Sequence, residues 1–436
     1  MLNGQRPLLS GEEPPLSSSF WTATAGSGLS APRLSGEVHC DVVVIGGGFN
    51  GCTSALRLAE NGADAVLLEA SEIGAGATGR NAGMVNPGQF LGPKEIENAL
   101  GPEYGPRFLS SLGGAPELVR SLIQRLNIDC ALDARPIIRA AHNRKQGQLL
   151  AGQVAAWQAI GAQVETVERD ALAAMTGTDV YHSALLDYRG FTIQPLAYIR
   201  GLARAARNAG ARLFESSPVM HLQRDGERWR VQCAGGSVTA KRVIISTNAL
   251  TARLLPQMQQ EIVPVGAFGY ASEPLEPAIR ARILPSGHSL YDTHKIPLFL
   301  RYDPQGRLMV GCLGFLPREV GDASDWAARI LKRLYPDLSP LRWQYRWSGT
   351  LGLTPDNLPH LVQPAPGLLA TVGCNGRGIA PNTYFGHLLA DLALDRPVES
   401  PLPLRAPRAY PYRELKLEGY DLGMRLYRNT LLFHFN

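Results

Sequence analysis

The chain has 436 residues, of which 45% are hydrophobic and 19% are charged. That balance excludes wholesale disorder, and the length is enough for about two or three domains. The formal net charge of +5 is small for this length, and no run of Lys or Arg would contact a phosphate backbone, so we expect no nucleic-acid partner.

The cysteines and the N-terminus indicate the compartment. No two cysteines form a C-x-x-C pair, and they are scattered through the chain as Cys40, Cys52, Cys130, Cys233, Cys312 and Cys374. This spacing argues against a zinc site or a disulfide framework and favours a reducing compartment, so we expect no bound metal. Glu12 and Glu13 stand where a signal peptide would be apolar, and no stretch of about 18 apolar residues occurs. We therefore expect a cytoplasmic protein, and peripheral membrane contact stays open.

A strand, turn, helix and strand open the body of the chain. Residues 1–36 are rich in Pro, Ser and Gly, and we expect an irregular arm there. The run CDVVVIGGG (40–48) predicts a strand buried on both faces, with a helix from about 48 to 61. AVLLEA (65–70) predicts a second buried strand, which completes a βαβ unit.

The pattern changes after this unit. Residues 94–175 are predicted to be mostly helical, with one strand at PIIRAAH (136–142). An amphipathic helix running into a strand is expected over 194–213, followed by a meander of PVMHLQR, RWRVQCA and KRVIIST.

The second half of the chain has strands first and a helix last. The segment 257–345 holds the strand candidates VPVGAFGYAS, IPLFLRYD and RLMVGCL and a helix near 322–335, which suits an antiparallel substrate domain. Residues 366–393 predict a strand, a glycine turn and a helix. The pattern assigns no role to the tail, 401–436.

The turn after the first strand has the glycine spacing of a dinucleotide site. Gly46 permits the tight turn, Gly48 lets the backbone approach a pyrophosphate, and Gly51 allows close packing of the helix. Glu69 ends the next strand, where a carboxylate accepts hydrogen bonds from both ribose hydroxyls and repels a 2′-phosphate. The glycines alone are a weak signal, but they stand between a buried strand and a helix, as the motif requires.

Two further glycine-rich loops favour FAD over NAD. GAGATGRNAGMVNPG (74–88) follows the second strand and can lie along an extended dinucleotide. Gly373, Gly376 and Gly378 precede a helix whose positive end, with Arg377 beside it, would face the pyrimidine edge of a flavin. A plain NAD dehydrogenase would leave both loops unexplained.

Together and in this order, these segments resemble the glycine/D-amino-acid oxidase family of flavoproteins over roughly residues 36–400. The matching pieces are VVVIGGGFNG, VLLEASEIGAGATGRNAG, VIISTNAL and GCNGRGIAPNTYFGHLLADL. Within the family, GRNAGMVNPG, LFLRYDPQGRLMVGCLG and WSGTLGLTPDNLPHL resemble the bacterial L-pipecolate oxidases and, more distantly, the gamma-glutamylputrescine oxidases.

The resemblance implies an α/β (α+β) fold. One part is a Rossmann-like, FAD-binding βαβ domain of the glutathione-reductase type, and the other is an antiparallel-sheet substrate domain. The expected division is an N-terminal arm (1–36), a discontinuous FAD-binding domain (37–95, 150–250 and 346–400), a substrate domain (96–149 and 251–345) and a C-terminal tail (401–436).

The resemblance also implies which residues meet the cofactor. It assigns the pyrophosphate to Gly46, Gly48, Phe49, Asn50 and Gly51, and the diphosphate side to Thr247 and Asn248. It assigns the adenosine part to Glu69, Ala70 and Val219. It assigns the flavin lining to Gly79, Arg80, Asn81, Gly83 and Met84, and the flavin's pyrimidine end to Gly376, Arg377, Gly378 and Ile379.

The chain departs from the family where relatives hold the substrate carboxylate. Relatives that act on glycine carry an Arg in the loop after a late Trp-x-Gly, whereas Trp347-Ser348-Gly349 is followed here by Thr350-Leu351-Gly352. No Cys stands where sarcosine oxidases attach their flavin, so we expect non-covalent FAD. We expect Arg301 to hold the carboxylate, with Arg377 and Tyr270 as further candidates.

The reaction that the resemblance implies is hydride transfer from a carbon bearing an amine nitrogen to flavin N5, giving an imine that hydrolyses. This mechanism requires no dedicated acid or base from the protein, and an apolar pocket would help by favouring the neutral amine. We expect a cyclic or N-substituted amino acid such as L-pipecolate, with an amine of the gamma-glutamylputrescine type as the alternative. An electron-transfer subunit stays open, as does the choice of oxygen or a quinone as acceptor.

Overall fold

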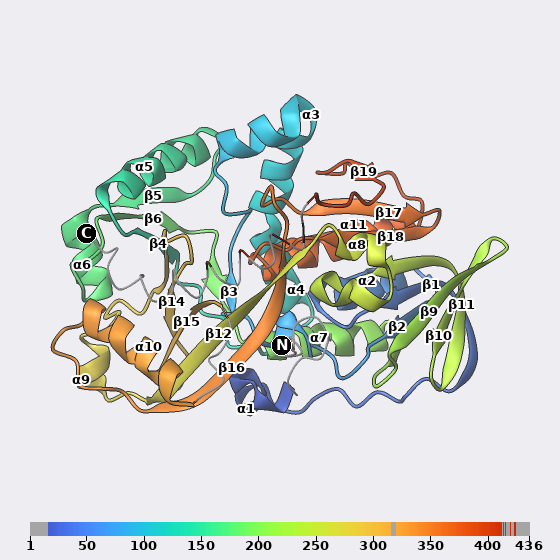
Figure 1. The fold of residues 1–436 in the computed structure, drawn as a ribbon, viewed down its shortest axis with the longest axis horizontal. Helices are drawn as coiled ribbons and strands as arrows, with labels where there is room; N and C mark the ends of the chain where they lie inside the picture. Colours follow the sequence, from blue (N-terminus) through green and yellow to red (C-terminus); the bar gives the residue numbers. More distant parts are fainter. Residues whose placement is uncertain are drawn as a thin grey trace.

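The computed structural model describes residues 16–314 and 320–411, together with Arg413, Leu415, Gly419 and Gly423. Two large sheets lie side by side, a nine-stranded sheet on the right of Figure 1 and an eight-stranded sheet on the left. A separate pair joins β3 (Met84–Val85) to β7 (Phe191–Thr192). The expected mixed α/β architecture is confirmed. Within the described ranges, no helix combines the length and the apolar character that crossing a membrane requires.

The nine-stranded sheet contains the expected βαβ unit. Its strands are β1 (Gly36–Ile45), β2 (Ala65–Leu68), β8 (Arg212–Phe214), β9 (Val219–Asp225), β10 (Arg228–Cys233), β11 (Gly236–Ile245), β17 (His360–Ala365), β18 (Leu368–Val372) and β19 (Leu404–Arg405). β1 pairs in parallel with β2 on one side and β11 on the other. Alternate residues of β1 enter two cores, Val42 and Val44 on the side of the helices, and Val43 and Ile45 on the side of the β9–β10 hairpin.

Three helices pack together on one face of this sheet. α2 (Phe49–Glu60) contacts both α7 (Pro195–Asn208) and α11 (Ile379–Ala393). A Cβ on Gly386 would lie 2.6 Å from the carbonyl oxygen of Asn50, so this glycine lets α11 approach α2 closely. The close contact brings the glycine turn before α11 next to the glycine turn before α2.

The eight-stranded sheet is antiparallel apart from the parallel pair β4–β13. Its strands are β4 (Ile137–Ala141), β5 (Val164–Val167), β6 (Ser183–Asp187), β12 (Val263–Pro274), β13 (Ser289–Asp292), β14 (Phe299–Tyr302), β15 (Arg307–Leu313) and β16 (Trp343–Leu353). α10 (Val320–Leu334) covers its outer face, and its Trp326 and Ile330 share a core with Leu300 of β14.

The sheets divide the chain differently from the expected domain segments. β5 and β6 belong to the eight-stranded sheet, although 150–250 was assigned to the FAD-binding domain. β16 also begins in this sheet and extends through 346–353. The prediction of a single strand within 94–175 is corrected, because that segment also contains β5, which pairs with β6. Its sequence, VETV, has an exposed polar centre and is too short to show a strand period.

The remaining helices connect and flank the sheets. They are η1 (Leu16–Ser18), α1 (Phe20–Thr24), η2 (Ala77–Gly79), α3 (Pro93–Gly113), α4 (Ala115–Arg125), α5 (Arg144–Ala159), α6 (Arg169–Thr176), η3 (Asn248–Arg253), α8 (Pro256–Gln259) and α9 (Pro277–Arg280). The arm is more regular than expected, because η1 and α1 lie in it and Phe20 and Trp21 are buried. Residues 1–15 and most of the tail after 411 lie outside the described residues.

Candidate functional site

The turn between β1 and α2 has the shape of a dinucleotide cradle. Gly46 has a φ of +106°, and a Cβ there would lie 3.0 Å from the carbonyl oxygen of Ser246. A Cβ on Gly51 would lie 1.8 Å from the carbonyl oxygen of Gly46, so only glycine lets α2 begin this close to the strand. Gly48 caps α2 without a side-chain hydrogen bond, which leaves N–H groups of the first turn for an anion.

Glu69 stands at the end of β2, next to this cradle. Its carboxylate accepts hydrogen bonds from the N–H groups of Gly47 at 2.7 Å and Ser71 at 2.9 Å. Burial raises the pKa of the Glu69 carboxyl, and these donors offset the effect only in part. Ribose hydroxyls that donated to this carboxylate would stabilise its charged form. Exposed Ala70 follows directly in the chain.

The start of β9 is tied to the same strand end. The N–H of Ser217 donates to the carbonyl oxygen of Glu69 at 2.8 Å, and Val219 begins β9 two residues later. This places Val219 near the proposed adenosine position.

The side chains of Phe49 and Asn50 point into the fold. Asn50 Nδ2 donates to Thr371 Oγ1 at 2.9 Å, and Asn50 Oδ1 accepts from Ser246 Oγ at 2.8 Å. The ring of Phe49 is buried, with its centroid 5.8 Å from that of Tyr198. Any contact of these two residues with a pyrophosphate would therefore be made by their backbone.

Five consecutive carbonyl oxygens of the loop Gly79–Gly83 accept hydrogen bonds from side chains far away in sequence. The donors and acceptors are Ser19 Oγ to Gly79 O (2.7 Å), Trp347 Nε1 to Arg80 O (2.9 Å), Trp21 Nε1 to Asn81 O (2.7 Å), and Arg301 Nη1 to Ala82 O (3.0 Å) and Gly83 O (2.9 Å). Because these five hydrogen bonds hold its carbonyl groups, the backbone of the loop is fixed in place. Part of this loop lines the cavity described below.

Arg301 is one of the residues that hold this loop, whereas the sequence analysis proposed that it binds the substrate carboxylate. It is only 2% exposed, and its Nη1 also donates to the carbonyl oxygen of Ile193 at 3.1 Å. Burial lowers the pKa of its guanidinium to about 10. Arg301 is absent from the residues that line the cavity, so the expectation that it holds the substrate carboxylate is corrected.

A row of paired residues crosses the eight-stranded sheet and forms one wall of the cavity. Strand register aligns Arg139 (β4), Tyr291 (β13), Phe299 (β14), Gly311 (β15), Gly269 (β12) and Trp347 (β16). Paired residues face the same side of a sheet. A Cβ on Gly311 would lie 2.5 Å from the Phe299 ring, and one on Gly269 would lie 2.5 Å from the Trp347 ring. The two glycines therefore make room for the two rings.

Tyr270 belongs to the opposite face, because it is the next residue after Gly269 in β12. It pairs with Val310 and lies in the core under α10, with its ring centroid 5.9 Å from that of Phe268. Its proposed role in substrate binding is corrected for this reason.

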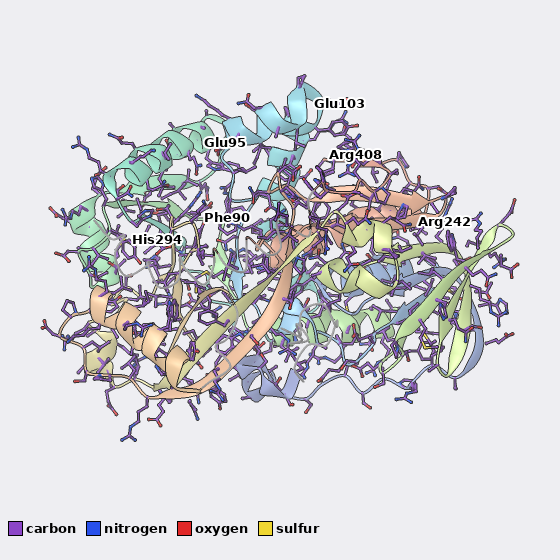
Figure 2. The ribbon with its side chains drawn as sticks, viewed as in Figure 1. Phe90, Glu95, Glu103, Arg242, His294 and Arg408 are labelled. Atoms are coloured by element: carbon purple, nitrogen blue, oxygen red, sulfur yellow. The ribbon has the colours of Figure 1, made fainter. Side chains whose placement is uncertain are left out.

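The cavity has a volume of 1340 Å³. It is lined both by the glycine-rich loops that the sequence assigned to the flavin and by this wall. At one end it is lined by Arg80, Asn81, Met84, Gly376, Gly378 and Ile379, all of which the sequence assigned to the flavin. Figure 2 labels Phe90, Glu95 and His294, which also line the cavity. The structure thus brings residues of both glycine-rich loops, which the sequence assigned to the flavin, into the lining of a single cavity.

Arg377 lies behind this cavity rather than in its lining. Its Nη2 donates to the hydroxyl of Tyr291 at 2.7 Å. Its guanidinium carbon lies 4.4 Å from the ring centroid of Phe90 and 5.0 Å from that of Tyr291. Arg377 therefore positions two rings that do line the cavity.

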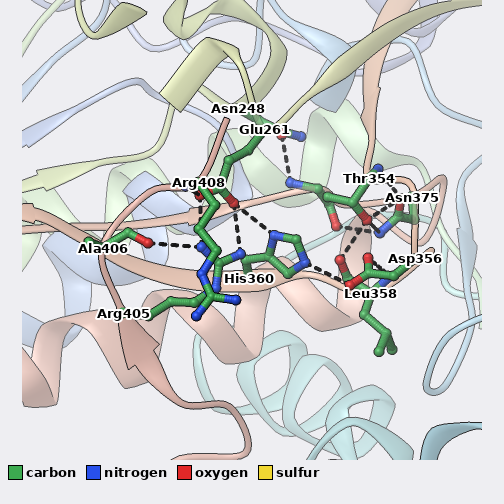
Figure 3. Close-up of polar contacts among 11 residues, drawn as sticks. Asn248, Glu261, Thr354, Asp356, Leu358, His360, Asn375, Arg405, Ala406 and Arg408 are labelled. Carbon is green, nitrogen blue, oxygen red and sulfur yellow. Dashed lines mark hydrogen bonds and ion pairs between the residues drawn. The ribbon is translucent and has the colours of Figure 1, made fainter. Parts of the chain in front are cut away.

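The glycine turn before α11 is held by a polar network, drawn in Figure 3. Asn375 Oδ1 accepts from the N–H of Thr354 at 2.7 Å, and Asn248 Oδ1 accepts from the N–H of Gly373 at 3.2 Å. Gly373 has a φ of +81°, and a Cβ there would lie 2.2 Å from the Thr354 side chain. Thr247 lies over the other glycine turn, 3.4 Å from the position of a Cβ on Gly46. Thr247 and Asn248 thus connect the two turns.

His360 anchors the same region from the side. Its ring nitrogens contact Glu261 Oε2 at 2.8 Å and Asp356 Oδ2 at 3.0 Å, and Arg405 also binds Glu261 (Figure 3). Burial alone would lower the pKa of His360, but the bonds to Asp356 and Glu261 outweigh it, and the pKa is raised.

The two glycine cradles, the uncapped start of α2 and the cavity between the loops define an oxidoreductase that binds an extended dinucleotide. The chain belongs to the family of FAD dependent oxidoreductases, because the model of that family matches residues 41–392. FAD is therefore its cofactor. The proposed contacts are compatible with FAD, because the glycine turns leave no room for a Cβ and the Glu69 carboxylate lies beside the first turn, where it could accept hydrogen bonds from a ribose.

Individual relatives agree with this family. The chain is 32% identical to the gamma-glutamylputrescine oxidoreductase of Escherichia coli (strain K12), over 86% of this chain and 88% of the relative. It is 24% identical to the glycine oxidase of Geobacillus kaustophilus (strain HTA426), over 81% of this chain and 92% of the relative. The crystal structure of glycine oxidase from Geobacillus kaustophilus matches with a TM-score of 0.68 at 23% identity, over 83% of this chain and 96% of that chain. The family resemblance is confirmed, and the chain is an FAD-dependent oxidoreductase that acts on amines or amino acids.

Among the cavity residues that the sequence analysis did not single out are Phe90, Arg139, Tyr291 and Phe299. One signal was available, since Arg139 is a lone cation inside the strand predicted at 136–142. The other three required the pairing of β13 and β14 and the path of the loop after residue 88.

Proposed function

We propose that this protein oxidises the C–N bond of a cyclic or N-substituted amino acid such as L-pipecolate. The observation that supports this proposal is the cavity, whose lining includes both the aromatic side chains of Tyr291, Phe299 and Trp347 and residues of the loops that we assign to the flavin. A saturated ring fits against such a wall through apolar contact.

The chain's own residues support this reaction mainly by excluding water. When bound, FAD accepts a hydride from the carbon next to the amine nitrogen. The rings of Phe90 and Phe299 and the side chain of Ile296 make part of the cavity lining apolar, and an amine held against that part is favoured in the neutral form from which a hydride can leave. The fixed carbonyls of Gly79–Gly83 keep the loop in place while the substrate binds. We assign no acid or base to the protein, and oxygen or a quinone is the proposed final acceptor.

An amine of the gamma-glutamylputrescine type is the second candidate. It is favoured by the relative of that name, at 32% identity, and by a cavity of 1340 Å³ that can hold more than a single small ring beside a flavin. Such an amine would extend from the flavin loops past Tyr291 towards Gln153 and Glu95.

Trapping of the product separates the two candidates. The FAD-loaded protein would be incubated in air, or with a quinone, with L-pipecolate or with gamma-glutamylputrescine, and the carbonyl or cyclic imine product would be captured with ortho-aminobenzaldehyde. We expect product from L-pipecolate at the higher kcat/KM. Product from gamma-glutamylputrescine alone would transfer the assignment to the second candidate.

A further inference from the structure

We infer that Arg139 and the hydroxyl of Tyr291 form the binding site for the substrate carboxylate, so that the enzyme selects amines that also carry a carboxylate. The inference rests on the proposed function and names the group that the substrate must have. It assigns the anchor to a strand of the sheet, in place of the loop Arg that relatives acting on glycine carry.

The register of the sheet places these two residues together. Arg139 of β4 pairs directly with Tyr291 of β13 in the parallel part of the sheet, and both line the cavity. Phe299 is the next residue in the row, so the apolar wall begins where the two polar groups end. A carboxylate at Arg139 would therefore leave the rest of a substrate against aromatic rings.

One nitrogen of the Arg139 guanidinium is hydrogen-bonded to the protein, and another is available to a ligand. Its Nη1 donates to Gln153 Oε1 at 2.8 Å, while its buried Nε has no hydrogen-bond partner among the described residues. Gln153 Nε2 contacts Glu95 Oε2 at 3.5 Å, which turns the amide so that its oxygen faces Arg139. A Cβ on Gly92 would lie 2.9 Å from the Gln153 side chain, so Gly92 makes room for this arrangement.

The Tyr291 hydroxyl is prepared to donate. It accepts the hydrogen bond from Arg377 Nη2, so its own hydrogen is available for another acceptor. A guanidinium and a hydroxyl on neighbouring strands would then supply charge-assisted hydrogen bonds to one carboxylate. Arg377, which the sequence proposed as an anchor, becomes a positioning residue for Tyr291 in this arrangement.

The charge balance around Arg139 also favours an anion. Its only hydrogen-bonding side-chain partner within the described part of the chain is the neutral amide of Gln153. Burial is the main cause that lowers the pKa of the Arg139 guanidinium; Arg377 lowers it further, while Tyr291 and the carboxylate of Glu95 raise it in part. Arg139 is half-buried and makes no direct ion pair with a described residue, and a bound carboxylate would offset the cost of its partial burial.

The test measures binding and turnover separately. Cyclohexanecarboxylate and its uncharged amide would be titrated into FAD-loaded wild-type protein and Arg139→Met, with the visible flavin spectrum as the signal. We expect the carboxylate to bind the wild type, and to bind Arg139→Met roughly 100-fold more weakly, because at least two charge-assisted hydrogen bonds are lost. Binding of the amide should be equal in both proteins.

Three comparisons make the test decisive. Arg346→Met removes an exposed arginine from β16 of the same sheet and should bind like the wild type. Arg139→Lys keeps the charge and should recover part of the loss, which shows that a folded site is being measured. Equal carboxylate binding by Arg139→Met and the wild type would overturn the inference, as would a selective loss in Lys295→Met, which removes another cavity cation.

The result is independent of the proposed substrate. If the carboxylate binds through Arg139 but L-pipecolate is not oxidised, the anchor stands and the substrate assignment fails. If L-pipecolate is oxidised with an unchanged KM in Arg139→Met, the substrate assignment stands and the anchor is wrong.

Discussion

Replacing Trp21 with Phe tests whether the N-terminal arm supports the flavin loop. The substitution removes the indole N–H that donates to the carbonyl oxygen of Asn81 at 2.7 Å. It keeps an aromatic ring next to Phe20, whose centroid lies 4.9 Å away, and Trp347, at 6.2 Å. The change therefore separates the hydrogen bond from most of the packing.

The size of the effect follows from the carbonyl that loses its donor. Leaving a largely buried acceptor without a partner costs about 1–3 kcal/mol. If roughly half of that cost falls on the loop conformation that binds the cofactor, the FAD dissociation constant rises about 2- to 12-fold, since 1.4 kcal/mol is a factor of ten. Removing Ser19 Oγ, which donates to Gly79 O at 2.7 Å, should act in the same direction.

The assay is titration of apoprotein with FAD, followed by the quenching of flavin fluorescence. Trp326→Phe is the matched control, because Trp326 is 2% exposed and its Nε1 has no hydrogen-bond partner among the described residues. This control should lower stability without changing FAD affinity. Equal FAD dissociation constants for Trp21→Phe and the wild type would refute the role of the arm.

Three further predictions follow from the same contacts. Gly51→Ala places a Cβ 1.8 Å from the carbonyl oxygen of Gly46, and we expect protein purified without the yellow flavin absorbance. Arg301→Met removes a donor to three carbonyls and should lower the free energy of unfolding by about 3 kcal/mol, measured in urea, without a selective rise in KM for carboxylate substrates. His360 has a raised pKa in the folded protein, so its contribution to stability is complete below its unfolded pKa of about 6.5 and is lost as pH rises through the folded value. The Tm difference between wild type and His360→Asn should therefore shrink from about pH 6 to about pH 9.

Each of these predictions has an outcome that contradicts it. Full FAD content in Gly51→Ala would show that the turn relaxes. A KM that rises only for carboxylate substrates in Arg301→Met would restore Arg301 as the anchor. A Tm difference that grows with pH would show that His360 is neutral in its network.

Local patterns were enough to predict the βαβ unit that carries the proposed cofactor site. Gly46, Gly51 and Glu69 lie in one βαβ unit, and their geometry depends on short-range contacts that the sequence spacing records. The strands β12, β14 and β15 were also predicted close to their observed bounds, because each is a clear apolar run.

Long-range contacts decided what the sequence could not predict. Arg301 and Arg139 both lie in predicted strands, and nothing local distinguishes a cation under a loop from one in a cavity. Arg301 is covered because the loop Gly79–Gly83 lies over it, and Arg139 is in the cavity because β4 pairs with β13. Tyr270 was proposed to bind substrate, but it follows Gly269 in β12, and a shift of one residue along a strand moves a side chain to the other face of the sheet.

Anaerobic titration of the FAD-loaded protein with L-pipecolate tests the central claim most directly. We expect the visible flavin band to bleach as substrate is added without oxygen, and cyclohexanecarboxylate to compete with the substrate. A flavin that stays oxidised at saturating L-pipecolate would contradict the proposed substrate.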